Sequence, residues 1–386
     1  MIDLDSNATT RLAPEVMDAM LPWLRDQHAN PSGAYGAAKR ARQAIEQARS
    51  QVAELLGARP EEIVFTSGGT ESVNAALHSL HTLTGEGEIL VSAIEHSAVL
   101  RFVDALPRQT RRLGVDAGGR VELDEMREAS GGAAFISLMA ANNEVGTIQP
   151  LNEAIAIARE AGIPIHSDAT QAIGKIPFTI EDHPADLISL SAHKFHGPKG
   201  IGALYVRQGL DFKPLLHGGG QEKGRRSGTE NTAAIVAMGV AAELARRELE
   251  NDLSQRLGQL RDRFEEQVLE SLTGVQRNGS LQHRLPNTSH LSFKGCEAEG
   301  LIILLDEFGV QCSAGSACMT GKREPSHVQM AMGIDPATAK SSLRFSFSRL
   351  NAQQDADDAA KALVRAVEKL RGIQGSGTGP VVIYGS

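Results

Sequence analysis

Two kinds of hydrophobic pattern alternate along the first two thirds of the chain. Short runs of mostly apolar residues predict buried strands, and longer segments with an apolar residue every three or four positions predict amphipathic helices. Because the two kinds follow one another in turn, we expect an α/β fold with a mostly parallel, doubly wound sheet that is covered by helices. Strands of this series are predicted at residues 62–66, 88–92, 133–140, 163–167 and 201–206.

The last third of the chain is organised differently. A long helical pattern at residues 231–273 predicts a connector, and a chain of 386 residues is long enough for two hydrophobic cores. We therefore expect a large domain at residues 14–255, a smaller α+β domain made of residues 1–13 and 256–371, and a flexible glycine-rich tail at residues 372–386. The pattern after the connector predicts strands at 288–293 and 342–348 and helices at 297–308, 325–332 and 355–370.

One polar stretch stands between two apolar runs near the middle of the chain. The sequence S-A-H-K-F-H-G-P-K-G at residues 191–200 places Lys194 between the end of a predicted strand and a Gly-Pro turn. A lysine amine becomes a nucleophile when it is removed from water and its pKa falls, as in lysines that form Schiff bases. The flanking Ser191 and His193 can both hydrogen-bond an anion such as phosphate. A surface hairpin with a solvated lysine is the alternative interpretation.

Further polar residues follow other predicted strands. A glycine turn at residues 67–72 joins a strand to a helix and presents free backbone N–H groups to a phosphate, although it lacks the ending of a Walker motif. Taken alone, this turn is more often structural, and Asp168 could simply cap a helix. The complete set of strand-end residues is Thr70, His96, Asn143, Asp168, Gln171 and Lys194. Because ligands of doubly wound sheets bind beyond the carboxyl ends of the strands, this set predicts one common site.

Composition excludes several classes of protein. The formal net charge of −8 argues against nucleic-acid binding, which needs a basic face. No apolar run approaches the roughly 20 residues of a membrane-spanning helix, and the first residues do not resemble a signal peptide. The cysteines Cys296, Cys312 and Cys318 are too few for a disulfide framework, and His78 and His81 lack the further ligands of a metal site. We expect a cytoplasmic protein without a metal, a nucleic-acid partner or a membrane partner.

The strand-end residues offer the groups that pyridoxal 5'-phosphate (PLP) requires. This cofactor needs a Schiff-base lysine, for which Lys194 is the candidate, and an acidic partner for its ring nitrogen, for which Asp168 is the candidate. Its phosphate needs hydrogen-bond donors, and its ring needs a stacking side chain such as His96. Gln171 and Asn143 are suited to its phenolic oxygen.

The segment at residues 191–200 resembles the PLP-lysine segment of cysteine desulfurases of the NifS/IscS type. The resemblance extends over nearly the whole chain except the tail. The other matching segments are D-S-N-A-T-T at 5–10, N-P-S at 30–32, T-S-G-G-T-E-S at 66–72, E-H at 95–96, N-N-E-V-G at 142–146, H-S-D-A-T-Q at 166–171, R-S-G-T at 226–229, G-S-A-C at 315–318 and S-L-R-F-S-F-S-R at 342–349. The resemblance implies fold-type I PLP architecture with a seven-stranded sheet, a homodimer, and removal of sulfur from L-cysteine with L-alanine as the other product.

The resemblance also implies a role for each matching residue. Lys194 would carry the cofactor, and Asp168 would pair with its pyridine nitrogen. His96 would stack on the ring, and Gln171 would bond the phenolic oxygen. The residues expected at the phosphate are Gly69, Thr70, Ser191, His193 and Thr229 of the partner subunit. The residues expected at the substrate carboxylate are Asn143, Asn30 and Arg344, the last through a bidentate pair.

Cys318 is the expected sulfur acceptor and, with Lys194 and His96, completes the expected catalytic set. It lies among small residues that offer little to pack against, and such a setting suits a thiolate that must reach the substrate sulfur and carry it outward. Cys296 and Cys312 lack this setting and are expected to be structural. The persulfide on Cys318 would pass to a sulfur-acceptor or iron-sulfur scaffold protein for cluster assembly.

The sequence departs from the desulfurase pattern at Gly69, where an alanine is usual, and at Met319, where threonine or serine is usual. The segment K-R-E-P-S-H at residues 322–327 is closer to the nitrogen-fixation branch than to the housekeeping branch. A selenocysteine lyase, or another fold-type I PLP enzyme acting on a small amino acid, is the alternative. A sulfur-delivery protein without catalysis is a further alternative, which the joint presence of Lys194, Asp168 and Cys318 disfavours. A simple phosphate-binding module, which needs only the glycine turn, is another.

Overall fold

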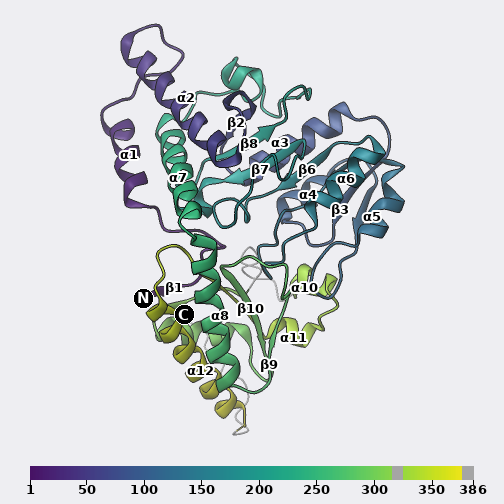
Figure 1. Cartoon of the computed structure of the whole chain (residues 1–386), viewed down its shortest axis with the longest axis vertical. Helices are drawn as coiled ribbons and strands as arrows, with labels where there is room; N and C mark the ends of the chain where they lie inside the picture. Colours follow the sequence, from purple (N-terminus) through teal and green to yellow (C-terminus); the bar gives the residue numbers. More distant parts are fainter. Residues whose placement is uncertain (315–324, 376–386) are drawn as a thin grey trace, which may run out of the picture.

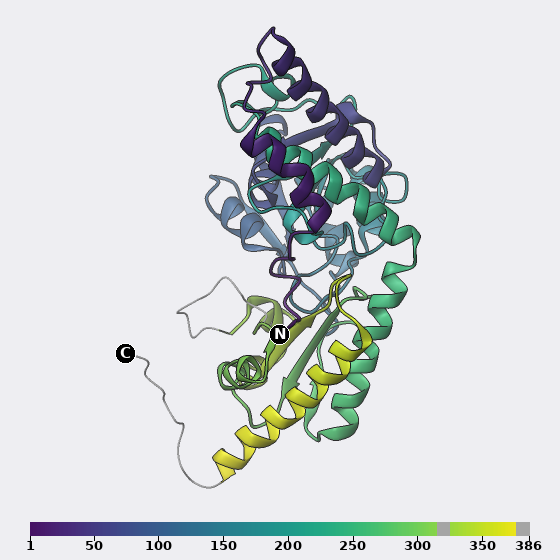
Figure 2. The same cartoon turned by 90° about the vertical axis from the view of Figure 1, so that its left-hand side faces the viewer.

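The computed structural model of the chain describes residues 1–314 and 325–375 (Figure 1). A large sheet with helices on both faces forms the upper part of the view, and a smaller sheet with its own helices forms the lower part. The view at right angles shows the N-terminal segment running between the two parts (Figure 2). Residues 315–324, which include Cys318 and Met319, lie outside the described residues, as do residues 376–386 of the tail.

The large sheet has seven strands in the order β2-β8-β7-β6-β5-β3-β4. β8 runs antiparallel to β2 and β7, and every other neighbouring pair is parallel. All strands except β8 therefore end at the same edge of the sheet. Their bounds are β2 (Ile63–Thr66), β3 (Glu88–Ser92), β4 (Thr110–Leu113), β5 (Ala133–Ser137), β6 (Ile165–Asp168), β7 (Leu187–Ser191) and β8 (Gly202–Val206). The mostly parallel sheet predicted from the alternating pattern is confirmed.

Helices cover both faces of this sheet, which explains why its central strands read as unbroken apolar runs. One hydrophobic core joins the sheet to α1 (Pro14–Arg25), α2 (Gly36–Leu56), α5 (Leu123–Ser130), α6 (Leu151–Ala161) and α7 (Thr232–Glu250). A second core on the other face joins it to α3 (Gly69–Leu83) and α4 (Ser97–Asp104). Local signals set the helix ends: Pro14 occupies the first turn of α1, and Gly57 ends α2 with a left-handed φ of 62°.

The smaller part is built on a three-stranded antiparallel sheet in the order β12-β10-β9. Its core includes Phe264, whose ring centroid lies 4.8 Å from that of Phe345 and 5.9 Å from that of Phe347. Its elements are α8 (Leu253–Ser271), β9 (Val275–Arg277), β10 (Thr288–Phe293), α9 (Ala298–Glu307), α10 (His327–Ala331), α11 (Pro336–Lys340), β12 (Ser342–Ser346) and α12 (Gln353–Gly375). A two-stranded parallel sheet pairs β1 (Ile2–Asp3) with β11 (Val310–Gln311).

The predicted helical stretch at residues 231–273 is two helices rather than one. α7 and α8 are separated at Asn251 and Asp252, and Asp252 has a left-handed φ of 58°, a conformation that Asp and Asn tolerate better than most residues. The physical reason is that α7 packs on the core of the large sheet, whereas α8 packs on the core of the small one. The division of the chain near residue 255 stays a prediction.

The C-terminal helix is longer than predicted. α12 continues through Gly375, so residues 372–375, which the sequence analysis assigns to the tail, are helical. Within the described part of the chain, no helix combines the length and the apolar character that crossing a membrane requires.

The N-terminal arm links the two sheets. Ser346 N donates to Leu4 O at 2.6 Å and Ser6 N donates to Ser346 O at 3.2 Å, so the arm first follows β12. Further along, Thr10 N donates to His193 O at 2.8 Å, beside the end of β7. The arm therefore lies across the edge at which the strands of the large sheet end.

Candidate active site

The strand ends of the large sheet carry the predicted site residues. Thr70 follows β2, His96 follows β3, Asp168 ends β6, and Lys194 follows β7 in a short 3-10 turn at Ala192–Lys194. These strands run in the same direction, so their ends meet at one edge. Hydrogen bonds through Asn7 join Gln171 to Lys194, and electrostatic effects connect His96 with Asp168 and Lys194.

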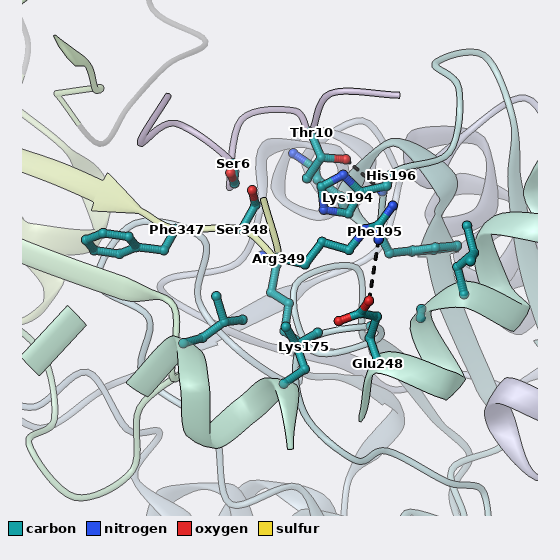
Figure 3. Close-up of a pocket in the computed structure, with 15 residues that line it drawn as sticks. Ser6, Thr10, Lys175, Lys194, Phe195, His196, Glu248, Phe347, Ser348 and Arg349 are labelled. Carbon is teal, nitrogen blue, oxygen red and sulfur yellow. Dashed lines mark hydrogen bonds and ion pairs between the residues drawn. The ribbon is translucent and has the colours of Figure 1, made fainter. Parts of the chain in front are cut away.

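Lys194 is not a solvated surface lysine. Its side chain is half-buried, and Nζ donates to Asn7 O and to Ala8 O, each at 2.7 Å. β7 and β8 do form an antiparallel hairpin, but the arm covers the turn where Lys194 stands. Figure 3 shows Lys194 lining a small cavity together with Thr10, Lys175 and Arg349. The arrangement holds the amine at a fixed place beneath the arm.

His96 has a defined orientation because it caps α4. Its Nδ1 accepts a hydrogen bond from Ala98 N at 3.1 Å, so the proton of the neutral ring is assigned to Nε2. Burial lowers the pKa of His96; the charge of Asp168 opposes that shift, and Lys194 adds to it. The ring is therefore held neutral near Asp168 and Lys194, which suits a side chain that stacks on a flat cofactor.

Asp168 is buried beside a neutral histidine. Its Oδ1 accepts from Thr170 N at 3.0 Å. His166, two residues earlier, is bonded through its ring nitrogens to Ser137 Oγ and Ser189 Oγ, each at 2.9 Å, and burial lowers the pKa of His166 to about 4. Because the histidine stays uncharged, the carboxylate of Asp168 remains available to a cationic partner in the site.

The start of α3 is a tight turn with the features of an anion-binding cup. Gly68, with φ 153°, precedes the helix, and no side chain in the described residues caps it. A Cβ added at Gly69 would lie 3.3 Å from Thr170 Oγ1 and 3.4 Å from Ser191 Cβ, so the cup is tight at this point. Thr170 Oγ1 is buried and has no hydrogen-bond partner among the described residues. Uncapped N–H groups and a hydroxyl without a partner fit a bound phosphate.

His193 lies at the same edge. Its Nδ1 is hydrogen-bonded to Thr9 Oγ1 at 3.2 Å. Burial, with smaller effects from Lys194 and Lys199, lowers the pKa of His193 to about 4. A neutral imidazole can offer a single N–H donor to a phosphate without adding a charge.

Arg344 is buried and has protein partners for its guanidinium. Nη2 donates to Asp5 Oδ1 at 2.7 Å, and Nη1 donates to Asn143 O at 2.9 Å. Asn7 Nδ2 donates to the same Asn143 carbonyl at 3.2 Å. Asp5 was not expected from the sequence as the partner of Arg344. A substrate carboxylate that binds this guanidinium has to share it with Asp5.

Two of the predicted site residues, Asn30 and Thr229, do not join the strand-end residues of the same chain. Asn30 is exposed, and its Oδ1 accepts from Ser32 N at 2.9 Å; Thr229 is exposed as well. The loop between α1 and α2, which carries Asn30, lies at the end of the molecule far from β10 and β12 in both views (Figures 1 and 2). Cys318 lies outside the described residues. Cys296 and Cys312 are described, and burial raises the pKa of both thiols, that of Cys312 to about 12.

Three functional candidates were missed by sequence reasoning. Asn7 contacts Lys194, Gln171 and Asn143, although its matched segment at residues 5–10 carried no assigned role. Lys175 is fully buried four residues after Gln171, and a lysine after a glycine turn gives no sign of burial in the sequence. Glu95 stands beside His96 in the matched E-H pair; its Oε1 accepts from Ser92 Oγ at 2.7 Å and from Met139 N at 2.8 Å.

Comparison with known proteins identifies the family. Residues 2–358 match the aminotransferase class-V family. A cysteine desulfurase of Gluconacetobacter diazotrophicus is 45% identical over 375 residues, which cover 95% of this chain and 94% of that protein. The chain is a cysteine desulfurase of the aminotransferase class-V family. The family uses PLP, so the predicted family, activity and cofactor are confirmed.

Comparison with solved structures agrees with this family assignment. A NifS-like protein has a TM-score of 0.88 and 36% identity, over 95% of this chain and 99% of that chain. SspA in complex with cysteine has a TM-score of 0.79 and 36% identity, over 90% of this chain and 99% of that chain. The predicted fold-type I architecture of the desulfurase is thereby confirmed.

Proposed function

We propose that the chain removes sulfur from L-cysteine, releases L-alanine, and carries the sulfur as a persulfide on Cys318. The observation that carries this proposal is that three features lie at one edge of the large sheet. They are the amine of Lys194, the buried carboxylate of Asp168 and the uncapped start of α3. Lys194, Asp168 and the cup at Gly69 and Thr70 match the aldehyde, the ring nitrogen and the phosphate of PLP. The cup with its buried Thr170 hydroxyl favours the phosphate end in particular.

Each remaining residue has a role that follows from its contacts. His96, kept neutral and oriented by Ala98 N, would stack on the ring. Gln171 would donate to the phenolic oxygen, and Ser191 and His193 would donate to the phosphate. When bound, PLP supplies an electron sink for negative charge at the substrate α-carbon.

The substrate side of the site would use Arg344, Asn143 and Lys194. The guanidinium of Arg344 would bind the carboxylate of L-cysteine, and Lys194 would take up the proton from its α-carbon. The thiolate of Cys318 would attack the substrate sulfur, forming an S–S bond as the carbon–sulfur bond breaks. The remaining carbon fragment would take up protons and leave as L-alanine.

Contacts of described residues on both sides of the segment at 315–324 favour Cys318 as the acceptor. Before it, Ser313 exchanges backbone hydrogen bonds with Arg344, at 2.7 and 3.2 Å. After it, Ser326 Oγ donates to Glu144, the neighbour of Asn143, and His327 Nε2 donates to Glu95 O at 3.0 Å. The chain thus enters and leaves this segment beside residues that flank the proposed substrate site.

We further propose a homodimer in which each subunit completes the other's site. Within one chain, the loops that carry Asn30 and Thr229 lie close together. A cavity lined by Ser32 from the first loop and by Gly220 and Glu222 from the second supports their proximity. From this end of the molecule, Thr229 of the partner subunit could reach the phosphate, as the family resemblance implies.

We also propose a destination for the sulfur. Transfer from Cys318 to an acceptor or iron-sulfur scaffold protein, and a place in nitrogen fixation, rest on the resemblance alone. The cytoplasm as the compartment and the lack of a nucleic-acid partner rest on composition.

The test is product release by the PLP-loaded wild type and by Cys318→Ser. We expect the wild type to form L-alanine and sulfide from L-cysteine in equal amounts with a thiol reductant present. Cys318→Ser should retain the visible absorbance of bound PLP and lose sulfide formation. Equal activity of the two proteins would remove Cys318 from the mechanism. A much higher rate with L-selenocysteine, independent of Cys318, would favour the selenocysteine lyase alternative.

A further inference from the structure

Lys175 is a buried lysine at the centre of the site with no role in the proposed reaction. Its exposed fraction is 4%, and it lies in the turn that follows β6. Nζ donates to Asn7 Oδ1 at 2.8 Å and to Gln171 Oε1. Figure 3 shows Lys175 and Lys194 lining the same cavity, next to Ser6 and Thr10 of the arm.

We propose that Lys175 is a positioning residue that fixes the amide orientation of Gln171 and holds the N-terminal arm over Lys194. The first part of the inference rests on the proposed function, because it concerns the donor that Gln171 presents to the phenolic oxygen of PLP. The second part concerns the protein alone.

The orientation of the Gln171 amide follows from its two partners. A lysine N–H can be accepted only by the oxygen of an amide, so Oε1 faces Lys175. Nε2 then points to the other side and donates to Asn7 O at 3.0 Å. An amide nitrogen carries two hydrogens, and the second is available to the phenolic oxygen. Without Lys175, only the bond to Asn7 O fixes the amide, so the flipped orientation, which presents an oxygen where a donor is needed, becomes less unfavourable.

The hold on the arm follows from the bonds of Asn7. Its backbone oxygen accepts from Lys194 Nζ at 2.7 Å, as well as from Gln171. Its side-chain oxygen accepts from Lys175 and from Asn287 Nδ2 at 3.0 Å. Both lysines therefore bind Asn7: Lys194 donates to its main-chain oxygen, and Lys175 donates to its side-chain oxygen.

The surroundings of Lys175 disfavour the charged form of its amine. Burial lowers the pKa of Lys175 well below its usual value, and the nearby cations Lys194 and Arg344 act in the same direction. Arg344 is itself paired with Asp5. The N–H groups of Lys175 match the two acceptors on Asn7 and Gln171, so Lys175 can act through these two hydrogen bonds.

The test uses Lys175→Met, which keeps the length of the side chain and removes its donors. Lys199→Met is the matched control, because Lys199 is an exposed lysine in the turn after Lys194. The readout is the pH midpoint at which the visible absorption of bound PLP changes. A donor on the phenolic oxygen stabilises negative charge there, so its loss should raise this midpoint by about one pH unit, the size expected for one hydrogen bond.

A double-substitution cycle separates positioning from charge. Gln171→Leu should raise the midpoint as well, and Lys175→Met should cause no further shift in the Gln171→Leu background. If the shift caused by Lys175→Met persists undiminished in that background, Lys175 acts by charge and the positioning role is overturned. No shift in either background overturns it too. If Lys175→Met fails to fold, Lys175→Gln, which retains an N–H donor at shorter reach, is compared in the same cycle and should shift the midpoint less than Gln171→Leu.

The arm is tested by trypsin cleavage after the exposed Arg11, followed by intact mass. We expect the PLP-loaded Lys175→Met protein to lose residues 1–11 several-fold faster than the wild type and Lys199→Met. Equal cleavage rates would overturn the hold on the arm. If the wild type binds no PLP, the proposed function fails, whereas cleavage of the protein as purified still decides whether Lys175 holds the arm.

Discussion

Arg49 and Glu222 form a bidentate ion pair with both side chains buried: Nη1 lies 2.7 Å from Oε2, and Nη2 lies 2.8 Å from Oε1. Glu222 Oε2 also accepts from Phe65 N at 2.9 Å. Glu222 has a φ of 49°, a left-handed conformation that is unfavourable for residues other than glycine. The ion pair therefore holds the irregular loop that carries Thr229 against β2 in spite of this backbone strain.

Replacing Glu222 with glutamine should destabilise the protein by about 3 kcal/mol, because it leaves a buried guanidinium with a weaker partner. Burial acts to lower the pKa of Arg49, but the hydrogen bonds and charges of Glu222 and Glu46 outweigh it and raise that pKa. Glu46→Gln is the control, since this second partner is 61% exposed and should cost less than about 1 kcal/mol. Urea unfolding of the two variants measures both losses of stability, and equal losses would contradict a special role for Glu222.

Glu95 should make stability depend on pH. Burial raises the pKa of Glu95 to about 8, with Asp168 acting in the same direction, whereas the unfolded chain has the ordinary value near 4.5. Between these values the folded protein holds a proton that the unfolded chain has released, so this contribution to stability declines as the pH rises from about 4.5 to 8. The Glu95→Gln variant mimics the protonated side chain and should lack this decline.

The measurement is urea unfolding of the wild type and Glu95→Gln at pH 5.5, 6.5 and 7.5, values chosen within that window. As the pH rises, the free energy of unfolding of the variant minus that of the wild type should increase by up to about 1.4 kcal/mol per pH unit. A constant difference across the three pH values would show that Glu95 is ionised in the folded protein.

Ser326→Ala should slow the sulfur step while leaving the cofactor in place. Ser326 Oγ donates to Glu144, a buried carboxyl whose pKa burial raises, and its loss leaves Glu144 without this donor. We expect a loss of about 1–3 kcal/mol in stability and a several-fold lower rate of sulfide release, with unchanged PLP absorbance. Ser271→Ala, at the exposed end of α8, should change neither quantity. Unchanged sulfide release by Ser326→Ala would separate this contact from catalysis.

Arg344→Lys should raise the KM for L-cysteine at least about tenfold, because an ammonium keeps the charge but cannot form the bidentate pair. The kcat should change less than KM, since the carboxylate is bound in the ground state and the transition state alike. Arg277→Lys on β9 is a matched exchange at an exposed position and should leave KM unchanged. A KM for Arg344→Lys equal to that of the wild type would place the substrate carboxylate elsewhere.

The regular framework was largely predictable because local pattern specifies it. The apolar runs at residues 88–92 and 288–293 and the amphipathic stretch at 151–161 have the bounds of β3, β10 and α6. The break between α7 and α8 was not predictable in this way, since helical pattern continues through Asn251 and only the two separate cores require a bend there. β9 was missed because it is short and mostly exposed.

Only those site residues that directly follow a predicted strand could be identified from the sequence. Lys194, Asp168 and His96 each follow an apolar run and could be grouped by the topology of a parallel sheet. The contacts of Asn7 could not be foreseen, because they join residues 136 to 339 positions apart in the chain. The pairing of Arg344 with Asp5 spans 339 positions and is equally invisible to pattern.

The path of the N-terminal arm sets the order in which a growing chain can become competent. Synthesis delivers the arm first and β12 nearly last, yet the arm is held in place by its backbone bonds to Ser346. A ribosome-bound chain can therefore build the large sheet, and bond Asn7 and Ala8 to Lys194, before β12 adds its own bonds to the arm. The residue that arrives close to the end of translation is Arg344 on β12, so a chain truncated before β12 has Lys194 but lacks the guanidinium that bonds Asn143 O and Asp5.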